Sequence, residues 1–386
     1  MRISIVTVCL NRVNTIEKTI QSVINQNYSE IEYIIIDGRS SDGTVDIIKK
    51  YESYLACWVS ETDKGIYDAM NKGLAKSTGE IIAFLNSDDW YEENTLVKVN
   101  RYFEQYNPMI LAGRVNTLQK GKWTKYIGSL DGDKENIRMA MIYKQPAMFV
   151  HRGVFDRTGG FNTCYKVAAD FEWMLRVHDS GMRVMCVEDV FTNFSSTGIS
   201  NTNMDLTISE AREIATEALN RCEQYSREER ENWRIKINKC YDEQQARTDV
   251  KRIIRGRQLT EFSSLKISML EYFKEPSYVV WGIGVIGDDM YNLLTQLTLE
   301  VDYFVDRRSV GTAQMFRDRK VIHPHELVHG KKVIIATLEY EDEIANQMIE
   351  MGFQEDKDYI LYSTILQKLI EIYEKYYIRY GVRSQK

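Results

Sequence analysis

Short apolar runs alternate with amphipathic stretches in the first part of the chain. Each run ends in polar residues, and a run of this length predicts a strand that is buried on both faces of a parallel sheet. The runs cover residues 3–8, 32–36 and 80–85. Between them, apolar residues recur at helical spacing over residues 14–26, 42–54 and 65–76. This alternation predicts an α/β fold from the first residue onward.

The pattern changes after residue 204. Charged and polar residues at helical spacing dominate the next seventy residues, which predicts a helical connector. A second alternation begins at Tyr278, with strand-like runs at residues 278–281, 301–305, 332–336 and 359–362. We therefore expect a first domain at 1–204, the connector at 205–275, a smaller α/β domain at 276–363 and an amphipathic C-terminal helix or tail at 364–386.

Composition narrows the class of protein. The chain has 386 residues, of which 44% are hydrophobic and 27% are charged, as in an ordinary globular protein. Its formal net charge of −6 argues against a protein built mainly to coat nucleic acid, so we expect no nucleic-acid partner. The six cysteines include no Cys-x-x-Cys pair, and we expect them to be reduced thiols.

Two sequence features bear on cellular location. Residues 1–11 meet polar residues too early for the apolar region of a signal peptide, and no run of about eighteen apolar residues predicts a transmembrane helix. We expect a cytoplasmic protein whose membrane contact would be peripheral, at the inner face of the membrane. The basic stretch Lys251–Arg257 and the amphipathic tail are candidates for that contact, and a solvated helix face or an oligomer contact are the alternatives.

Polar side chains follow the three N-terminal strands, at the edge where sheets of this class bind ligands. Asp37 opens a glycine-containing turn and can accept hydrogen bonds from a base or a ribose, while the nearby Asp42 is also explained as a helix N-cap. The third strand is followed by Asn86, Ser87, Asp88 and Asp89. Two adjacent carboxylates favour a compensating cation or proton, although a turn and cap explain the pair equally well.

The order of these motifs resembles that of the inverting family 2 glycosyltransferases, whose N-terminal domain has the GT-A fold. Further segments follow the family in the expected order and extend the resemblance over residues 3–195. They are residues 61–73 (ETDKGIYDAMNKG), 77–80 (STGE), 145–150 (QPAMFV), 159–162 (GGFN) and 168–176 (AADFEWMLR). Several motifs in one order are much harder to obtain by chance than any single motif.

The resemblance implies a role for each matching polar residue. The donor nucleotide would be bound by Thr7, Asn11, Asp37, Asp63 and Asp88. Asp88 and Asp89 would hold a divalent metal, Mn²⁺ or Mg²⁺, which neutralises charge on the departing nucleoside diphosphate. Asp170 would be the general base that takes the proton from the acceptor hydroxyl.

Three positions depart from the family pattern. Asn86 stands where many relatives have the first Asp of an Asp-x-Asp motif, which puts the strength and the kind of metal binding in doubt. Gly38 replaces a second Asp that often follows the Asp37 position, and Ala169 stands where a Glu often precedes the base. None of the three removes the expected base or the carboxylate pair.

The expected activity is an inverting glycosyl transfer to a hydroxyl of a glycan or lipid-linked glycan. A UDP-sugar is the favoured donor, and bacterial surface polysaccharide synthesis is the expected setting. A nucleotidyltransferase on the same fold is one alternative, and a base at Asp170 argues against it. A non-catalytic scaffold that binds a sugar nucleotide is another. It would explain Asn86, but the presence of Asp88, Asp89 and Asp170 argues against it.

The second domain opens with a glycine pattern between a predicted strand and a predicted helix. Gly282, Gly284 and Gly287 form Gly-x-Gly-x-x-Gly, and Asp306 ends the next strand. The spacing predicts a small Rossmann-like accessory domain and makes these four residues a candidate ligand site. A fold does not establish a ligand, and we favour a scaffolding or homo-oligomer role.

Two further groups of residues invite a functional interpretation but favour a structural one. Tyr67, Trp90 and Trp173 could stack on a sugar, yet aromatic residues near strand ends more often pack in the core. The residues His323, His325 and His329 could share a metal, yet Pro324 and the residues after it predict a helix start on the surface.

Overall fold

The chain forms two compact units, Met1–Tyr241 and Asp242–Lys386, and the boundary between them falls within helix α9 (Arg227–Gly256). Each unit is described by itself. The computed structural model describes residues 1–119, 122–126, 137–139, 141–195, 203–222, 225–256, 259, 262–309, 314–338 and 340–375. Two expectations therefore fall partly outside the described residues, namely the end of the basic stretch at Arg257 and the tail after residue 375.

The described residues of the first unit form a nine-stranded mixed sheet. Its strands are β1 (Ile3–Cys9), β2 (Ile31–Asp37), β3 (Cys57–Ser60), β4 (Ile81–Phe84), β5 (Trp90–Tyr91), β6 (Ile110–Gln119), β7 (Lys122–Tyr126), β8 (Met148–His151) and β9 (Val184–Ser195). Their order is β3-β2-β1-β4-β8-β6-β9-β5, with β7 paired to β6. β1 pairs in parallel with β2 and β4, so the carboxyl ends of these three strands lie at one edge of the sheet.

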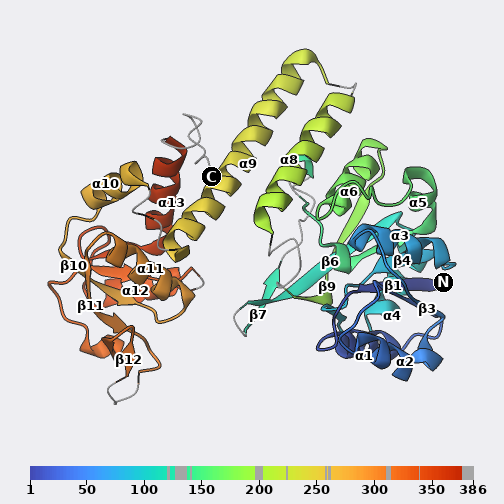
Figure 1. The fold of residues 1–386 in the computed structure, drawn as a ribbon, viewed down its shortest axis with the longest axis horizontal. Coiled ribbons are helices and arrows are strands. Elements are labelled where there is room, and N and C mark those ends of the chain that lie inside the picture. Colours follow the sequence, from blue (N-terminus) through green and yellow to red (C-terminus); the bar gives the residue numbers. More distant parts are fainter. Residues whose placement is uncertain are drawn as a thin grey trace. The chain divides into compact units, whose positions relative to one another are not determined.

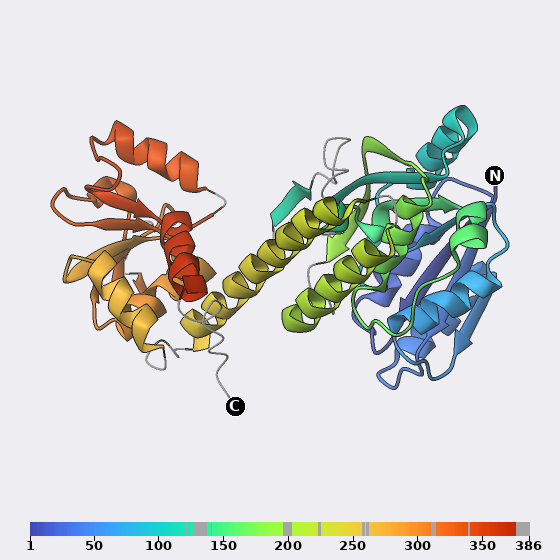
Figure 2. The same cartoon turned by 90° about the horizontal axis from the view of Figure 1, so that it is seen from above.

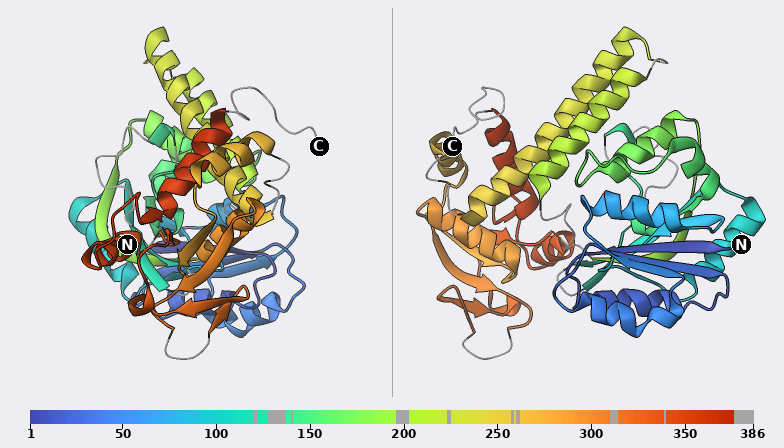
Figure 3. Two further views of the ribbon diagram at one scale, coloured as in Figure 1. Left: turned by 90° about the vertical axis from the view of Figure 1, so that its left-hand side faces the viewer. Right: turned by 45° about the vertical axis from the view of Figure 1, so that its right-hand side comes forward.

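Helices cover both faces of this sheet, as Figure 1 and the right-hand view of Figure 3 show. The helices are α1 (Ile16–Ile24), α2 (Thr44–Lys50), α3 (Ile66–Lys76), α4 (Thr95–Tyr106), α5 (Arg152–Thr158) and α6 (Ala169–Asp179). Ile3 and Ile5 of β1 pack in one core cluster with α1, α2 and α4, whereas Val6 and Val8 pack in another with α3, α5 and α6. A strand buried on both sides explains the unbroken apolar run in the sequence.

Helix α8 (Met204–Arg221) packs against α6 and lies side by side with the first part of α9 (Figure 2). Ile208 and Ile214 of α8 share a core cluster with Trp173 and Met174 of α6, and Ile237 of α9 joins the same cluster. The helix that follows the sheet in sequence is therefore built into the core of the first unit. Its contacts reach the helix that carries Asp170.

The second unit contains a six-stranded sheet within its described residues, ordered β12-β13-β11-β10-β14-β15. The strands are β10 (Ser277–Trp281), β11 (Glu300–Val305), β12 (Met315–Phe316), β13 (Arg319–Ile322), β14 (Val333–Ile335) and β15 (Tyr359–Leu361). The helices are α10 (Ser263–Tyr272), α11 (Val285–Gln296), α12 (Glu341–Glu350) and α13 (Tyr362–Tyr373). All neighbouring strands pair in parallel except β12, which runs antiparallel to β13.

The predicted α/β class is confirmed in both units. Observed strands begin and end close to the bounds of the apolar runs, for example Ile31–Asp37 for the run at 32–36. The apolar pattern does not predict β3, the strands from β5 to β9, β12 or β13. β3 has four residues and every one of them is at least partly exposed, so no buried apolar run marks it in the sequence. No helix in the described part of the chain is both long and apolar enough to cross a membrane.

Candidate active site

Asp37 organises the turn that joins β2 to α2. Its side chain is fully buried, and its carboxylate accepts hydrogen bonds from the backbone N–H of Ser40 at 3.0 Å, from the Ser40 hydroxyl and from the Ser60 hydroxyl at 2.6 Å. Asn11 lies beside this turn in a left-handed backbone conformation, and its side-chain oxygen accepts from the N–H of Ser41 at 3.0 Å. Asp37 and Asn11 therefore shape the turn from within.

Thr7 lies below this turn. Its side chain is fully buried in β1, with its hydroxyl 3.2 Å from the hydroxyl of Tyr33. The structure thus places Thr7 in the wall beneath the loop rather than on its surface.

Asp63 meets the turn from the loop between β3 and α3. A Cβ atom added to Gly38 would lie 2.6 Å from the Oδ2 atom of Asp63, so a side chain at position 38 could not be accommodated without displacing this carboxylate. The other oxygen of Asp63 accepts from the N–H of Gly65 at 3.0 Å. The departure from the family pattern at Gly38 thus has a physical reason, because Asp63 supplies the carboxylate in that space.

The carboxylate pair after β4 divides into one partly exposed and one buried side chain. Asp88 is half-buried, while Asp89 is 1% exposed. The Asp89 carboxylate accepts from the N–H of Ser195 at 2.8 Å and from the amide of Asn86 at 3.3 Å. Burial and the neighbouring Asp88 carboxylate raise the pKa of Asp89 well above its usual value. Two adjacent carboxyl groups in this state favour a compensating proton or cation.

The oxygens around this pair suit a hard divalent cation. The Oδ1 atom of Asn86 is buried and has no hydrogen-bond partner among the described residues. The carboxylates of Asp88 and Asp89 and this amide oxygen are the types of ligand that Mg²⁺ and Mn²⁺ prefer. No group of three or more His, Cys, Asp or Glu side chains that could hold a metal ion occurs in the described part of the chain.

Asp170 lies in the first turn of α6. Its Oδ1 atom accepts hydrogen bonds from the hydroxyl of Tyr67 at 3.0 Å and from the N–H of Phe171 at 2.9 Å. Burial raises the pKa of Asp170, while these two hydrogen bonds and the positive charge of Lys144 oppose that rise. A raised pKa makes a carboxylate a stronger base, which favours the role of a general base.

Tyr67 and Lys144 are site residues whose roles the sequence does not reveal. Burial and the Asp170 carboxylate raise the pKa of Tyr67 well above its usual value, so its hydroxyl remains a proton donor. Burial lowers the pKa of Lys144, and Asp170 opposes that change. The sequence signal for Tyr67 is its position, four residues after Asp63 at the start of α3. No comparable signal marks Lys144.

Two structural paths join the donor side to the base. Along the first, Asp63 and Tyr67 lie within one short segment at the start of α3. Along the second, the backbone of Ser195 binds Asp89, and its neighbour Phe194 has the Lys144 ammonium 6.0 Å from its ring centre. Lys144 in turn acts electrostatically on Asp170. Tyr67 and Lys144 thus link the surroundings of Asp170 to the segments that carry Asp63 and Asp89.

Trp173 and Tyr67 pack against other aromatic rings, as the sequence favours, and Arg176 also has a structural partner. Trp173 stacks on Phe155 at 4.8 Å between ring centres. The guanidinium of Arg176 binds both carboxylate oxygens of Glu172 at 3.0 Å. Tyr67 packs its ring against Phe161 at 5.6 Å while its hydroxyl serves Asp170, so it combines packing with a polar role.

The glycine loop of the second unit is packed closely on its own backbone. A Cβ atom at Gly282 would lie 2.8 Å from the carbonyl oxygen of Ala336, and one at Gly287 would lie 2.0 Å from the carbonyl oxygen of Gly282. Asp306 accepts from the backbone and the guanidinium of Arg308 at 2.9–3.0 Å. The motif therefore builds the strand-to-helix turn, and its acidic residue is occupied by an arginine.

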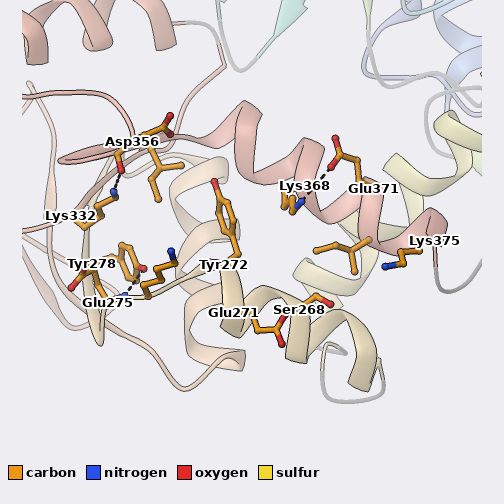
Figure 4. Close-up of a pocket in the computed structure, with 13 residues that line it drawn as sticks. Ser268, Glu271, Tyr272, Glu275, Tyr278, Lys332, Asp356, Lys368, Glu371 and Lys375 are labelled. Carbon is orange, nitrogen blue, oxygen red and sulfur yellow. Dashed lines mark hydrogen bonds and ion pairs between the residues drawn. The ribbon is translucent and has the colours of Figure 1, made fainter.

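A pocket of 710 Å³ lies elsewhere in the second unit, between α10, α13 and the sheet (Figure 4). Tyr278, Lys332 and Ile360 place it at the amino ends of β10, β14 and β15, opposite the edge at which such sheets bind ligands. Its lining mixes four lysines with four acidic residues. Lys332 is bonded to the carbonyl of Asp356, and Lys368 pairs with Glu371. These charges define no single class of ligand.

The three histidines of this unit also have structural partners. His323 caps a short helical turn by accepting from the N–H of His325 at 3.4 Å, and His329 stacks on Phe353 at 4.1 Å between ring centres. Both contacts agree with the structural interpretation.

Comparisons with known proteins agree with the geometry of the first unit. Residues 4–168 match the family described as glycosyl transferase family 2, and residues 276–359 match a domain described as C2185-like, N-terminal. The PGL/p-HBAD biosynthesis glycosyltransferase of Mycobacterium bovis is 29% identical over 210 residues, covering 52% of this chain and 80% of that protein. Glycosyltransferase AglE of Haloferax volcanii is 26% identical over 207 residues, covering 49% and 65%.

A solved structure shares the fold. Residues 1–349 of S. aureus TarS, in complex with UDP-GlcNAc, superpose with a TM-score of 0.51 at 14% identity, covering 77% of this chain and 90% of that chain. The family match and this similarity confirm the GT-A fold expected for the first unit.

Proposed function

We propose that the first unit, whose residues 4–168 match glycosyl transferase family 2, moves a sugar from a UDP-sugar to a hydroxyl of a glycan or lipid-linked glycan, with inversion at the anomeric carbon. The observation that carries the proposal is the state of Asp170. It is a carboxylate at the start of a helix, with a raised pKa and with donors on one of its oxygens, in a region shared with the donor residues. A scaffold without activity has no need of such a group.

The proposed reaction is a single displacement. The acceptor hydroxyl gives its proton to Asp170 while its oxygen forms a bond to the anomeric carbon. The bond from that carbon to the diphosphate oxygen breaks, and its electron pair leaves with the nucleoside diphosphate. Attack from the opposite face inverts the anomeric configuration. Tyr67 holds the Asp170 carboxylate in place through its hydroxyl, which leaves the other carboxylate oxygen for the acceptor.

The donor nucleotide would lie over the turn built by Asp37. Asp63 and Asp88 are partly exposed, so they are the carboxylates that can reach a ligand directly. Thr7, Asn11 and Asp37 act mainly by fixing the shape of the wall and the turn. The TarS fragment of similar fold was solved with UDP-GlcNAc, which makes UDP the first nucleotide to test.

Asp88 and Asp89 would hold Mn²⁺ or Mg²⁺, and close to the pair in sequence lies the buried Asn86 oxygen, which has no hydrogen-bond partner in the part of the chain that the structure describes. When bound, such a metal neutralises the charge that develops on the leaving diphosphate. The replacement of an Asp by Asn86 removes one negative charge from this set. We therefore expect weaker metal affinity than a site with three carboxylates would give.

The cellular setting follows from the acceptor. Extension of a surface glycan on a lipid carrier would place the enzyme at the inner face of the membrane, with peripheral contact only. The second unit would then act as an accessory domain in assembly. Among its relatives, the PGL/p-HBAD biosynthesis glycosyltransferase of Mycobacterium bovis carries a name that refers to PGL/p-HBAD biosynthesis.

Calorimetric binding of UDP, GDP, dTDP and CDP, each with and without Mn²⁺, tests the donor site. We expect UDP to bind in a metal-dependent way and Asp88→Asn to weaken binding about tenfold or more, because one metal ligand loses its charge. Asp156→Asn, which changes an exposed carboxylate on α5, should bind as the wild type does. Absence of binding by every nucleotide would contradict the transferase assignment, and preference for another base would change the donor.

A further inference from the structure

Glu210 of α8 is a buried carboxylate directed at the segment that leads into α6. It is 8% exposed. Its Oε1 atom accepts from the N–H of Lys166 at 2.8 Å, and its Oε2 atom accepts from the N–H groups of Val167 at 2.9 Å and Ala168 at 3.1 Å. Three consecutive backbone donors therefore converge on one side chain that comes from another helix.

These contacts hold the segment directly before α6, where the residue at the N-cap offers no capping side chain. Ala168 is the N-cap residue of α6 and has no side chain that can accept a hydrogen bond. The N–H groups before and at a helix start need acceptors, and the positive end of the helix dipole favours a negative charge there. Glu210 accepts from the N–H groups of the three residues directly before α6, and its carboxylate lies near the positive end of that helix. Consecutive N–H groups of this kind form a concave site that binds an anion.

The anchored segment ends two residues before the base. Asp170 lies in the first turn of α6, so the position of its carboxylate depends on where that turn begins. The charge of Glu210 also contributes to the raised pKa of Tyr67, which places it near the hydroxyl that donates to Asp170. Glu210 thus acts on the backbone that carries the base and lies close to the base's hydrogen-bond donor.

We propose that Glu210 is a positioning residue for the general base, holding the start of α6 so that the Asp170 carboxylate faces the acceptor. The inference rests on the proposed function. It assigns α8 to the catalytic machinery, although α8 lies beyond the residues 4–168 that match the family. Small displacements of a catalytic group, on the order of 1 Å, lower rates by about a hundredfold.

The test measures kcat and the donor KM for Glu210→Ala and Glu210→Gln in the full chain. Glu210→Ala removes all three acceptor contacts, and we expect kcat to fall about a hundredfold while the donor KM changes less than about twofold. In Glu210→Gln the amide oxygen still accepts but the amide nitrogen does not. We expect an intermediate loss of about tenfold.

Glu217 provides the matched control. It lies on the same helix, is exposed, and accepts a hydrogen bond from the hydroxyl of Tyr165 in the same segment at 3.3 Å. We expect Glu217→Gln to keep kcat within about twofold of wild type. Circular dichroism and thermal unfolding give the folded fraction, so that kcat is expressed per folded molecule.

Three outcomes would overturn the inference. They are an unchanged kcat per folded molecule in both Glu210 variants, an equal loss in Glu217→Gln, and a rise in donor KM that accounts for the whole effect. If Glu210→Ala does not fold, the graded loss in Glu210→Gln decides. Failure of the proposed function would look different, because Asp170→Asn would then retain turnover whatever the Glu210 variants do.

Discussion

The carboxyl-end edges of the two sheets carry similar motifs but treat their polar groups in opposite ways. At the first sheet, Asp89 and Asp170 both have a raised pKa, and Asn86 has a buried oxygen without a partner among the described residues. At the second sheet, Asp306 is occupied by three contacts to Arg308, and Gly282 is packed against Ala336. The polar groups at the first sheet are unfavourably placed without a ligand, whereas Asp306 at the second sheet already has hydrogen-bond partners.

This difference shows that a glycine motif alone does not establish a ligand-binding site. A glycine pattern between a strand and a helix occurs in many proteins because it lets the backbone turn and pack closely. Function needs side chains held in states that are unfavourable without a ligand. By that criterion we assign the proposed catalytic role to the first unit and propose that the second is an accessory domain.

The largest expected effect follows from removing the base. Asp170→Asn should lower kcat by about a thousandfold, because an amide cannot take the acceptor proton. Binding of UDP should change little, since Asp170 acts on the acceptor. Turnover assays and calorimetry on the same preparation measure the two quantities. Asp156→Asn on α5 is the control, and turnover near the wild-type value in Asp170→Asn would contradict the assignment of the base.

A smaller effect is expected at Tyr67. The hydrogen bond from the Tyr67 hydroxyl lowers the pKa of Asp170, whereas burial raises it. In Tyr67→Phe that pKa rises further, so Asp170 loses its proton only at higher pH and the acidic limb of the kcat profile moves to higher pH. We expect about a tenfold loss of kcat on that limb and a smaller loss on the alkaline side.

The ring of Tyr67 packs at 5.6 Å from that of Phe161, and phenylalanine keeps this contact, so the fold should be preserved. The measurement is the pH profile of kcat for both proteins, with thermal unfolding as the check on folding. A uniform loss at all pH values, with no displacement of the acidic limb, would mean that the hydroxyl does not act through the basicity of Asp170.

Much of the fold could be predicted from the sequence because periodicity reports burial. Ile3, Ile5, Val6 and Val8 are apolar because β1 is covered on both faces, and this is visible without a structure. β3 could not be predicted, because a short, partly exposed strand carries no such pattern. The sequence likewise predicts that Asp37, Asp88 and Asp89 lie at one edge of the sheet, because the parallel strands before them end there.

The remaining parts of the site depend on tertiary contacts. Glu210 follows Ala168 by forty-two residues, in a helical segment where charged residues are common, and nothing local shows that it faces three backbone donors. Asp63 occupies the space left by Gly38 through a contact between two loops. The sequence shows which residue types are present, but only the tertiary packing shows which of the polar side chains are already bonded to other groups of the protein.

The smallest expected effect concerns the carboxyl-end edge of the second sheet. A Cβ atom at Gly284 meets no atom within 4 Å, so Gly284→Asp should fold and should keep kcat within about twofold of wild type. Gly282→Asp is the matched variant. There the Cβ would lie 2.8 Å from the carbonyl of Ala336 at a φ of +124°, so we expect a lower melting temperature. Turnover and thermal unfolding of both variants separate stability from chemistry. A large loss of kcat in folded Gly284→Asp would show that the second unit is coupled to transfer, and the contrast between the two edges would then fail.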